Sequence, residues 1–251
     1  MNEEKFTGKA DTYAKFRPTY PEEFINYLYS DVGLSMDSKI ADIGAGTGRF
    51  SKLLLLKGSD VICVELNADM LNMAKQELTE FPNCRFVKGS AQNTTLDEKS
   101  IDFITVAQAF HWFDREVFKI ECNRMLKNNG KVILLWNSRD KSEGLTIENA
   151  KINDTFCPTK FKGFEGVMEE EPENYADFFK DGNCDYQIFK TEAVLNEEGF
   201  IGRNLSTSYA PKKDSENYGE YVNELKKLFR KYSKDGYLAI QNITRSYVGK
   251  V

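Results

Sequence analysis

The stretch Lys39-Ile-Ala-Asp-Ile-Gly-Ala-Gly-Thr-Gly-Arg49 decides the fold, because an apolar run of strand length passes directly into a glycine turn. Apolar residues at helical spacing follow over 49–57. Gly44, Gly46 and Gly48 can adopt positive φ, and without side chains they let the backbone approach a ligand closely. A strand, a glycine turn and a helix in this order predict a site for a nucleotide-like cofactor.

A second apolar run, over 61–65, ends in the carboxylate of Glu65. In doubly wound sheets an acid at this place, roughly 20 residues after the glycine turn, hydrogen-bonds ribose hydroxyls. The dinucleotide fingerprint requires a third glycine where this chain has Arg49. The spacing therefore favours a ligand with a ribose but without phosphates.

Runs of strand length alternate with segments of helical spacing along the chain. We expect strands at 40–43, 61–65, 84–88, 101–107, 131–136, 186–190 and 237–248. We expect helices at 22–28, 49–57, 68–78, 115–126, 197–206 and 215–232, with Asp114 as an N-cap and Asn128-Asn-Gly130 as a turn. This alternation predicts βαβ units and a parallel sheet.

The chain of 251 residues, 41% of them hydrophobic, is long enough for one large core with an added cover. We expect an N-terminal helical cover at 1–30 and a cofactor-binding core at 31–139. The strand rhythm lapses after residue 140, so 140–184 is expected to be an insertion over the site. Residues 185–251 are expected to complete the sheet.

Composition argues against several classes of function. The net charge of −5 and the lack of a long Lys/Arg cluster argue against a nucleic-acid substrate. One histidine and five scattered cysteines give little support for a metal site or a disulfide framework. No run approaches the roughly 18 apolar residues that a membrane span needs, and the start has no signal core, so we expect a cytoplasmic location.

Four segments resemble the class I S-adenosylmethionine-dependent methyltransferases, within them the methyltransferase type 11 group that includes trans-aconitate methyltransferase. They are Tyr13-Ala-Lys-Phe-Arg-Pro-Thr-Tyr-Pro21, Asp42-Ile-Gly-Ala-Gly-Thr-Gly48, Ala109-Phe-His-Trp-Phe-Asp114 and Arg124-Met-Leu-Lys-Asn-Asn-Gly-Lys-Val132. The resemblance implies S-adenosylmethionine as cofactor. It also implies an α/β, Rossmann-like, seven-stranded and mostly parallel sheet flanked by helices, with an antiparallel last strand and a helical or irregular cover.

The resemblance further implies which residues contact the cofactor. Glu65 would hold the ribose, Leu66 and Met70 would lie against the adenine, and Ser90 and Ala91 would cover its other edge. The family usually has Asp where this chain has Ser90, so that contact lacks charge assistance. The residues implied around the methionine part are those of the glycine turn, Asp42, Gly44, Ala45, Gly46 and Gly48.

Methyl transfer mainly requires alignment of the acceptor and exclusion of water. We expect His111 to take a proton from the acceptor or to orient it, beside Trp112, with Gln108 near the ligands. The alternative is that this aromatic run only packs against the next helix. Arg139 is a candidate for an acidic substrate.

Tyr13 and Arg17, in the N-terminal segment, are candidates for cofactor binding, because the guanidinium of Arg17 can bind the carboxylate of the cofactor or of an acidic substrate in bidentate fashion. Their alternative is an amphipathic surface helix. We expect a methyltransferase that acts on a small molecule, with a carboxylate acceptor suggested by the resemblance alone. A non-catalytic cofactor sensor and a nicotinamide-dependent oxidoreductase remain open, and the sequence does not indicate an oligomeric state.

Overall fold

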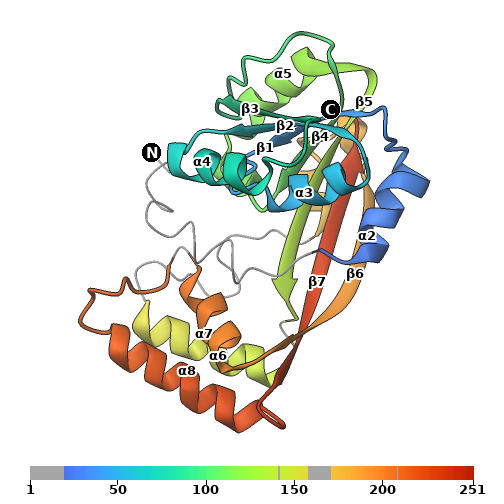
Figure 1. Cartoon of the computed structure of the whole chain (residues 1–251). Helices are drawn as coiled ribbons and strands as arrows, with labels where there is room; N and C mark the ends of the chain where they lie inside the picture. The colour runs from blue at the N-terminus through green and yellow to red at the C-terminus, as the bar shows by residue number, and fades with distance from the viewer. Residues whose placement is uncertain (1–19, 141, 158–170, 208) are drawn as a thin grey trace.

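Seven strands form one sheet in the computed structural model, which describes residues 20–140, 142–157, 171–207 and 209–251. The spatial order is β3-β2-β1-β4-β5-β7-β6 (Figure 1). The strands are Lys39–Ile43 (β1), Asp60–Glu65 (β2), Cys84–Lys88 (β3), Ile101–Ala107 (β4), Leu126–Arg139 (β5), Asp185–Leu195 (β6) and Leu238–Gly249 (β7). β7 pairs antiparallel with both β5 and β6, and the other pairings of the sheet are parallel. The predicted Rossmann-like sheet is confirmed.

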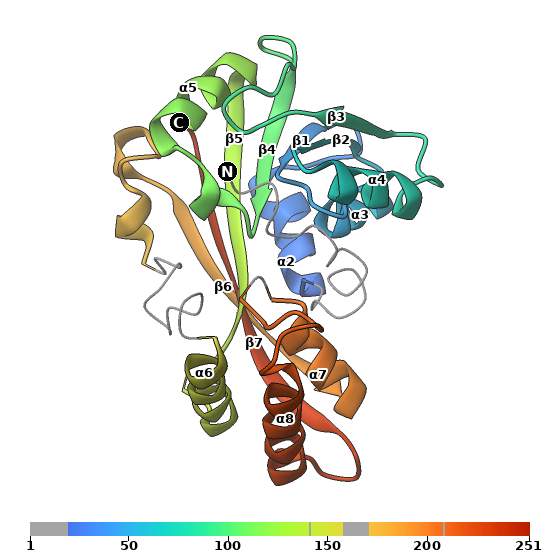
Figure 2. The ribbon, with the colours of Figure 1, turned by 90° about the vertical axis from the view of Figure 1, so that its left-hand side faces the viewer.

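Helices cover both faces of this sheet (Figure 2). One face carries α2 (Glu22–Tyr27), α3 (Arg49–Leu56) and α4 (Ala68–Glu77), and the other carries α5 (Arg115–Met125). The 3-10 turns η3 (Pro172–Tyr175) and η4 (Lys180–Gly182) lie on the α5 side. Each face buries an apolar cluster, and each large side chain in it contributes roughly 1.5–3 kcal/mol.

Three helices begin where the sequence supplies a capping side chain. Asn67, Asp114 and Asn196 each accept a hydrogen bond from the backbone N–H three residues later, at 3.0, 3.1 and 2.9 Å. Such caps satisfy one of the free donors of the first turn. The prediction of Asp114 as an N-cap is confirmed.

Three further helices form a second unit beyond the carboxyl end of β5 (Figure 1). They are α6 (Gly144–Phe156), α7 (Glu197–Leu205) and α8 (Tyr218–Tyr232), and they share a separate apolar cluster. Inside it the Tyr221 hydroxyl donates to Asn153 Oδ1 at 2.8 Å. We call α6, α7 and α8 the helical unit. The ends of β5, β6 and β7 connect it to the core.

The structure differs from the sequence-based expectation in three places. β5 is longer than 131–136 because it pairs with β7 as far as Arg139, opposite Asn242. Asn128 to Gly130 form an irregularity within that strand rather than a separate turn. The strands of 185–251 complete the sheet, whereas α7 and α8 pack on α6. Among the helices that the structure describes, none has the length and hydropathy to cross a membrane.

Candidate functional site

The glycine turn joins the end of β1 to the start of α3 and is fixed to the neighbouring strand. The N–H groups of Gly44 and Ala45 both donate to Val64 O, at 2.8 and 3.2 Å. Gly44, Gly46 and Gly48 have φ of 71°, 57° and 77°, in the left-handed region that favours glycine. The turn therefore has the backbone conformation that its sequence predicts.

These glycines differ in what a side chain would meet. A Cβ on Gly44 would lie 2.7 Å from Ala109 Cβ, and one on Gly48 would lie 2.6 Å from Leu78 Cδ1. A Cβ on Gly46 would meet nothing within 4 Å. Gly44 and Gly48 are thus required by packing, while Gly46 faces open space beside the turn.

The Glu65 carboxylate closes against the same turn. Its Oε2 accepts a hydrogen bond from Gly46 N at 2.8 Å, and its Oε1 accepts one from Asn67 N at 2.8 Å. Burial raises the pKa of this carboxyl, and the backbone donors of Asn67 and Gly46 oppose that rise. The structure therefore brings together the two features that the sequence analysis paired, an open glycine and an acid at the end of β2.

Asp42 supports the turn from inside. Its side chain is fully buried, and its carboxylate accepts hydrogen bonds from Ser51 Oγ at 2.5 Å and Thr105 Oγ1 at 2.9 Å. Burial raises the pKa of this carboxyl to about 6, against the opposing effect of the two hydroxyls. In this structure the carboxylate ties β1 to α3 and β4, so its predicted contact with the cofactor stays a prediction.

The residues implied for the adenine lie close to Glu65 in the fold. Leu66 is 38% exposed, whereas Met70 and Ala91 are buried. Ser90 Oγ accepts from Asn93 N at 3.1 Å, which forms a tight turn after β3. Gly89 N donates to Glu65 O at 3.3 Å, so this turn lies beside the acid. Their contacts with an adenine stay predictions.

The end of β4 lies against the glycine turn through Ala109. The next residues divide into two groups. Phe110 is buried among Phe118, Phe178 and Tyr175, so it serves packing alone. His111 and Trp112 are half-buried, and their rings lie 4.4 Å apart. This pair is the part of the run that remains a candidate for contact with an acceptor.

Gln108 and Arg139 point toward the extended part of β5 and the helical unit. Gln108 has φ of 62°, and its Nε2 donates to Asn137 O at 2.8 Å. Arg139 donates to Asn204 Oδ1 on α7 at 3.2 Å. Tyr13 and Arg17 lie outside the described residues.

Sequence reasoning did not identify Arg203 and Asn242, two buried polar residues that are hydrogen-bonded to each other. Arg203 on α7 is 6% exposed and donates to Asn242 Oδ1 on β7. The available signal was helical spacing, because Arg203 follows the buried Phe200 by three residues and must share its face.

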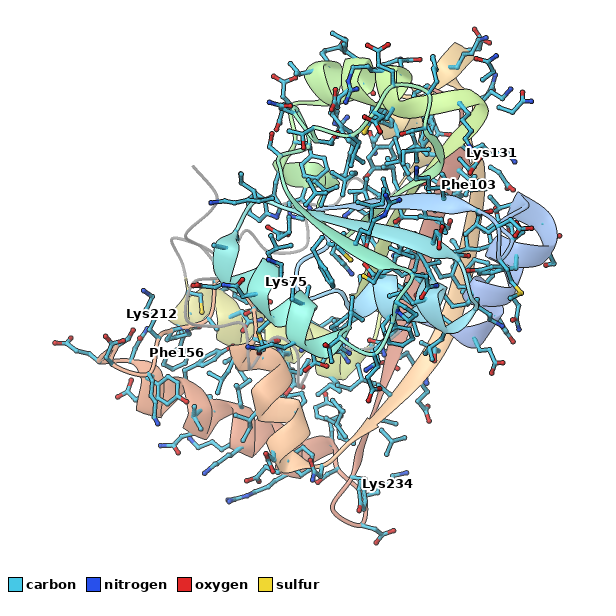
Figure 3. All side chains as sticks on the ribbon, turned by 45° about the horizontal axis from the view of Figure 1, so that its top comes forward. Lys75, Phe103, Lys131, Phe156, Lys212 and Lys234 are labelled. Carbon is cyan, nitrogen blue, oxygen red and sulfur yellow. The ribbon has the colours of Figure 1, made fainter. Side chains whose placement is uncertain are left out.

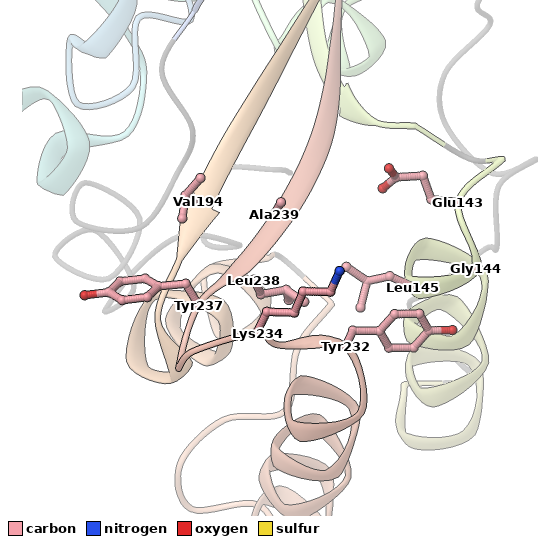
Figure 4. A pocket seen from close by; sticks show the side chains of 9 residues that line it. All are labelled: Glu143, Gly144, Leu145, Val194, Tyr232, Lys234, Tyr237, Leu238 and Ala239. Carbon is pink, nitrogen blue, oxygen red and sulfur yellow. The ribbon is translucent and has the colours of Figure 1, made fainter.

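A separate cavity of about 490 Å³ lies at the far end of the helical unit (Figure 4). Glu143, Tyr232, Lys234 and Tyr237 are among the residues that line it. These residues come from the start of α6, the end of α8 and the loop before β7. The cavity therefore shares no residue with the glycine turn.

Residues 41–134 match the methyltransferase domain family. An uncharacterized methyltransferase of Schizosaccharomyces pombe is 34% identical over 131 residues, which cover 52% of this chain and 51% of that protein. An uncharacterized methyltransferase of Mycobacterium tuberculosis is 33% identical over 147 residues, which cover 59% of this chain and 58% of that protein. The chain thus spans about half the length of the curated relatives that it matches.

A solved structure shares the fold over nearly the whole chain. A putative type II methyltransferase from Anaeromyxobacter dehalogenans superposes with a TM-score of 0.69 at 18% identity. The match covers 94% of this chain and 98% of that one. At this identity the likeness concerns the fold, and it includes the helical unit as well as the sheet.

Proposed function

We propose that the protein is a class I methyltransferase that transfers a methyl group from S-adenosylmethionine to a small-molecule acceptor; the match of residues 41–134 to the methyltransferase domain family and the shared fold support this proposal. One observation carries the proposal: the carboxylate of Glu65 is hydrogen-bonded to the N–H of Gly46, whose side-chain position opens onto free space. An adenosyl ligand needs both an acceptor for its ribose hydroxyls and room beside the backbone.

The residues present fit this cofactor. Glu65 has the acceptor oxygens that ribose hydroxyls require, and the N–H of Gly46 donates to one of them. Leu66 and the turn at Ser90 flank Glu65, where they would hold the adenine. When bound, S-adenosylmethionine supplies a methyl group on a sulfonium, which is an excellent leaving group.

The chain's own contribution is alignment and the exclusion of water. His111 and Trp112 form the half-buried side of the site at the end of β4. We infer that Trp112 positions the acceptor and that His111 orients it or removes its proton. We infer that the helical unit, which β5, β6 and β7 connect to the core, covers the acceptor.

The net negative charge supports a small acceptor rather than a nucleic acid. The net charge is −5. The lysines labelled in Figure 3, Lys75, Lys131, Lys212 and Lys234, lie on separate parts of the molecule.

The test is transfer of a labelled methyl group to a panel of small acids, amines and phenols, with separate calorimetric titrations of S-adenosylhomocysteine and NADH. We expect S-adenosylhomocysteine to bind, NADH to be ignored, and at least one acceptor to be methylated. Binding of NADH alone would identify an oxidoreductase. Donor binding without transfer to any acceptor would identify a sensor.

Substitution of His111 by Ala separates its role from cofactor binding. The residue lies beyond the turn that holds the donor, so donor affinity should stay within about twofold. The loss of a proton acceptor should lower turnover roughly 100-fold. An unchanged rate on the true acceptor would remove His111 from the mechanism.

A further inference from the structure

The strand β6 forms one edge of the sheet, and β7 is its neighbour on one side only. The pairing with β7 includes all 11 residues of β6, whereas β3 at the opposite edge has only 5 residues. On the outer side of β6, the residues that the structure describes make no backbone hydrogen bond with it. Such an edge presents a row of free N–H and C=O groups that can pair with another strand.

The side chains of β6 between 188 and 194 alternate between a half-buried face and an exposed face. Ile188 and Val194 lie on the exposed face and are 48% and 61% exposed. Lys190 lies between them and forms no salt bridge with the residues that the structure describes. Glu192 accepts a hydrogen bond from Gln241 at its Oε2, which leaves Oε1 for a further donor. The exposed face thus has an apolar residue at each end and two opposite charges between them.

Backbone geometry limits how two copies of this edge can pair with each other. Along an antiparallel strand, every second residue turns both its N–H and its C=O toward the open side. Hydrogen bonds across a twofold axis require two such residues to lie opposite each other. The axis must therefore pass beside one residue of each strand, rather than between two residues.

Charge distinguishes the registers that this geometry allows. An axis at Lys190 places two lysines opposite each other, and an axis at Glu192 does the same with two glutamates. Like charges directly opposite each other are destabilising. An axis at Thr191 instead places Lys190 of each copy opposite Glu192 of the other copy. The same register places the exposed Ile188 of each copy opposite the exposed Val194 of the other, so the edge is complementary to itself in charge and in apolar surface.

We propose that the edge of β6 joins two copies of this chain into a dimer, by antiparallel pairing of residues 188–194 about a twofold axis at Thr191. The sheet then continues from one copy into the other. The pairs of Lys190 with Glu192 fix the register, and the contacts of Ile188 with Val194 remove apolar surface from water. Val194 also lines the cavity shown in Figure 4, together with Tyr237, which is 59% exposed. The apolar surface of this edge therefore continues beyond the strand.

The proposed interface lies apart from the glycine turn. In the sheet, β7, β5 and β4 separate β6 from β1, which leads into the turn. Dimerisation and donor binding are therefore expected to be independent, and the inference does not rest on the proposed function.

The experiment is analytical ultracentrifugation of the full chain over a range of concentrations. We expect a dimer of the unaltered protein. Lys190→Glu creates two pairs of like charge across the axis, and so does Glu192→Lys, so each single variant should weaken dimerisation roughly 10- to 100-fold. The double variant Lys190→Glu/Glu192→Lys exchanges the two charges and should restore the dimer. An equimolar mixture of the two single variants should form a heterodimer, because every charge then meets its opposite.

Lys75→Glu is the matched control, because it makes the same change of charge at an exposed residue of α4, which packs on β2 and β3. It should leave the dimer intact, and donor affinity should be the same in all of these variants. The proposal would be overturned by an unaltered protein that stays monomeric up to roughly 0.1 mM, by single variants that dimerise as well as the control, or by a double variant that stays monomeric.

Discussion

Gly44, Gly46 and Gly48 share a positive φ but differ in their surroundings. Two of them are required for packing, and the third leaves space for a ligand. Packing against Ala109 and Leu78 requires glycine at positions 44 and 48. Position 46 is open, and its N–H is bonded to Glu65. The sequence motif identified all three residues but did not distinguish these roles, because the distinction depends on residues 19 or more positions away.

Asp42 and Arg203 show the limit of prediction at the scale of single residues. The resemblance implied a cofactor contact for Asp42, which stays a prediction, but the motif did not indicate that Ser51 and Thr105 enclose its carboxylate. Arg203 received no prediction, since a charged residue in a helix usually faces solvent. Its partner Asn242 lies on β7, 39 positions away in the sequence, so the pairing cannot be read from the local pattern.

Asp42 should make stability depend on pH. Its pKa is raised to about 6 in the folded protein, so the folded state holds the proton more tightly than the unfolded state does. This contribution favours folding at low pH and is lost as pH rises from about 4 to 6. The free energy of unfolding of Asp42→Asn, relative to that of the unaltered protein, should therefore be about 2 kcal/mol higher at pH 7 than at pH 4.5.

Urea unfolding at the two pH values measures this difference. Asp60→Asn, at the exposed start of β2, is the control for the same chemical change outside the core. If Asp42→Asn changed the free energy of unfolding equally at both pH values, the claim that folding raises the pKa of Asp42 would be wrong.

At the scale of elements, periodicity located the strands of the core closely. The bounds of β3 and β4 agree with the expected 84–88 and 101–107. β5 was underestimated because Asn137, Ser138 and Arg139 are polar, and their strand conformation is set by pairing with β7. The helix α6 was not distinguished within 140–184, because its buried face includes Thr146, Asn149 and Asn153, which weaken the apolar pattern.

Glu121 links α5 to the loop after β3. Its Oε1 accepts from Thr94 N at 2.9 Å and Thr94 Oγ1 at 2.6 Å, and Arg124 binds both carboxylate oxygens. The hydrogen bonds from Arg124 are the main reason that the pKa of this carboxyl is lowered to about 2. The Glu121 carboxylate thus holds the loop at Thr94 against α5, and Arg124 balances its charge.

Glu121→Gln should lower the free energy of unfolding by about 1–3 kcal/mol at pH 7. The stabilisation exists above the ordinary glutamate pKa and is lost as pH falls toward 2, so the difference between variant and unaltered protein should shrink at pH 3. Chemical denaturation at pH 7 and pH 3 measures both values. Glu116→Gln, on the exposed side of α5, should change stability by less; an equal loss would refute the specific role of Glu121.

At the scale of the molecule, the protein consists of a doubly wound core and a helical unit connected by long strands (Figure 1). The core followed from the sequence because each strand and helix carries its own apolar period. The helical unit did not, since α6 comes from one part of the chain and α7 and α8 from another. Only the completed fold shows that they enclose one apolar cluster.

The measurement that tests the central claim most directly is calorimetric titration of S-adenosylhomocysteine into the unaltered protein and into Gly46→Val. The control is Gly236→Val, which places the same side chain at a positive φ of 79° in an open turn far along the chain. We predict binding by the unaltered protein and by the control, and a loss of roughly 100-fold or more in Gly46→Val because its side chain occupies the cofactor's place. Equal affinity of Gly46→Val and the unaltered protein would contradict the account.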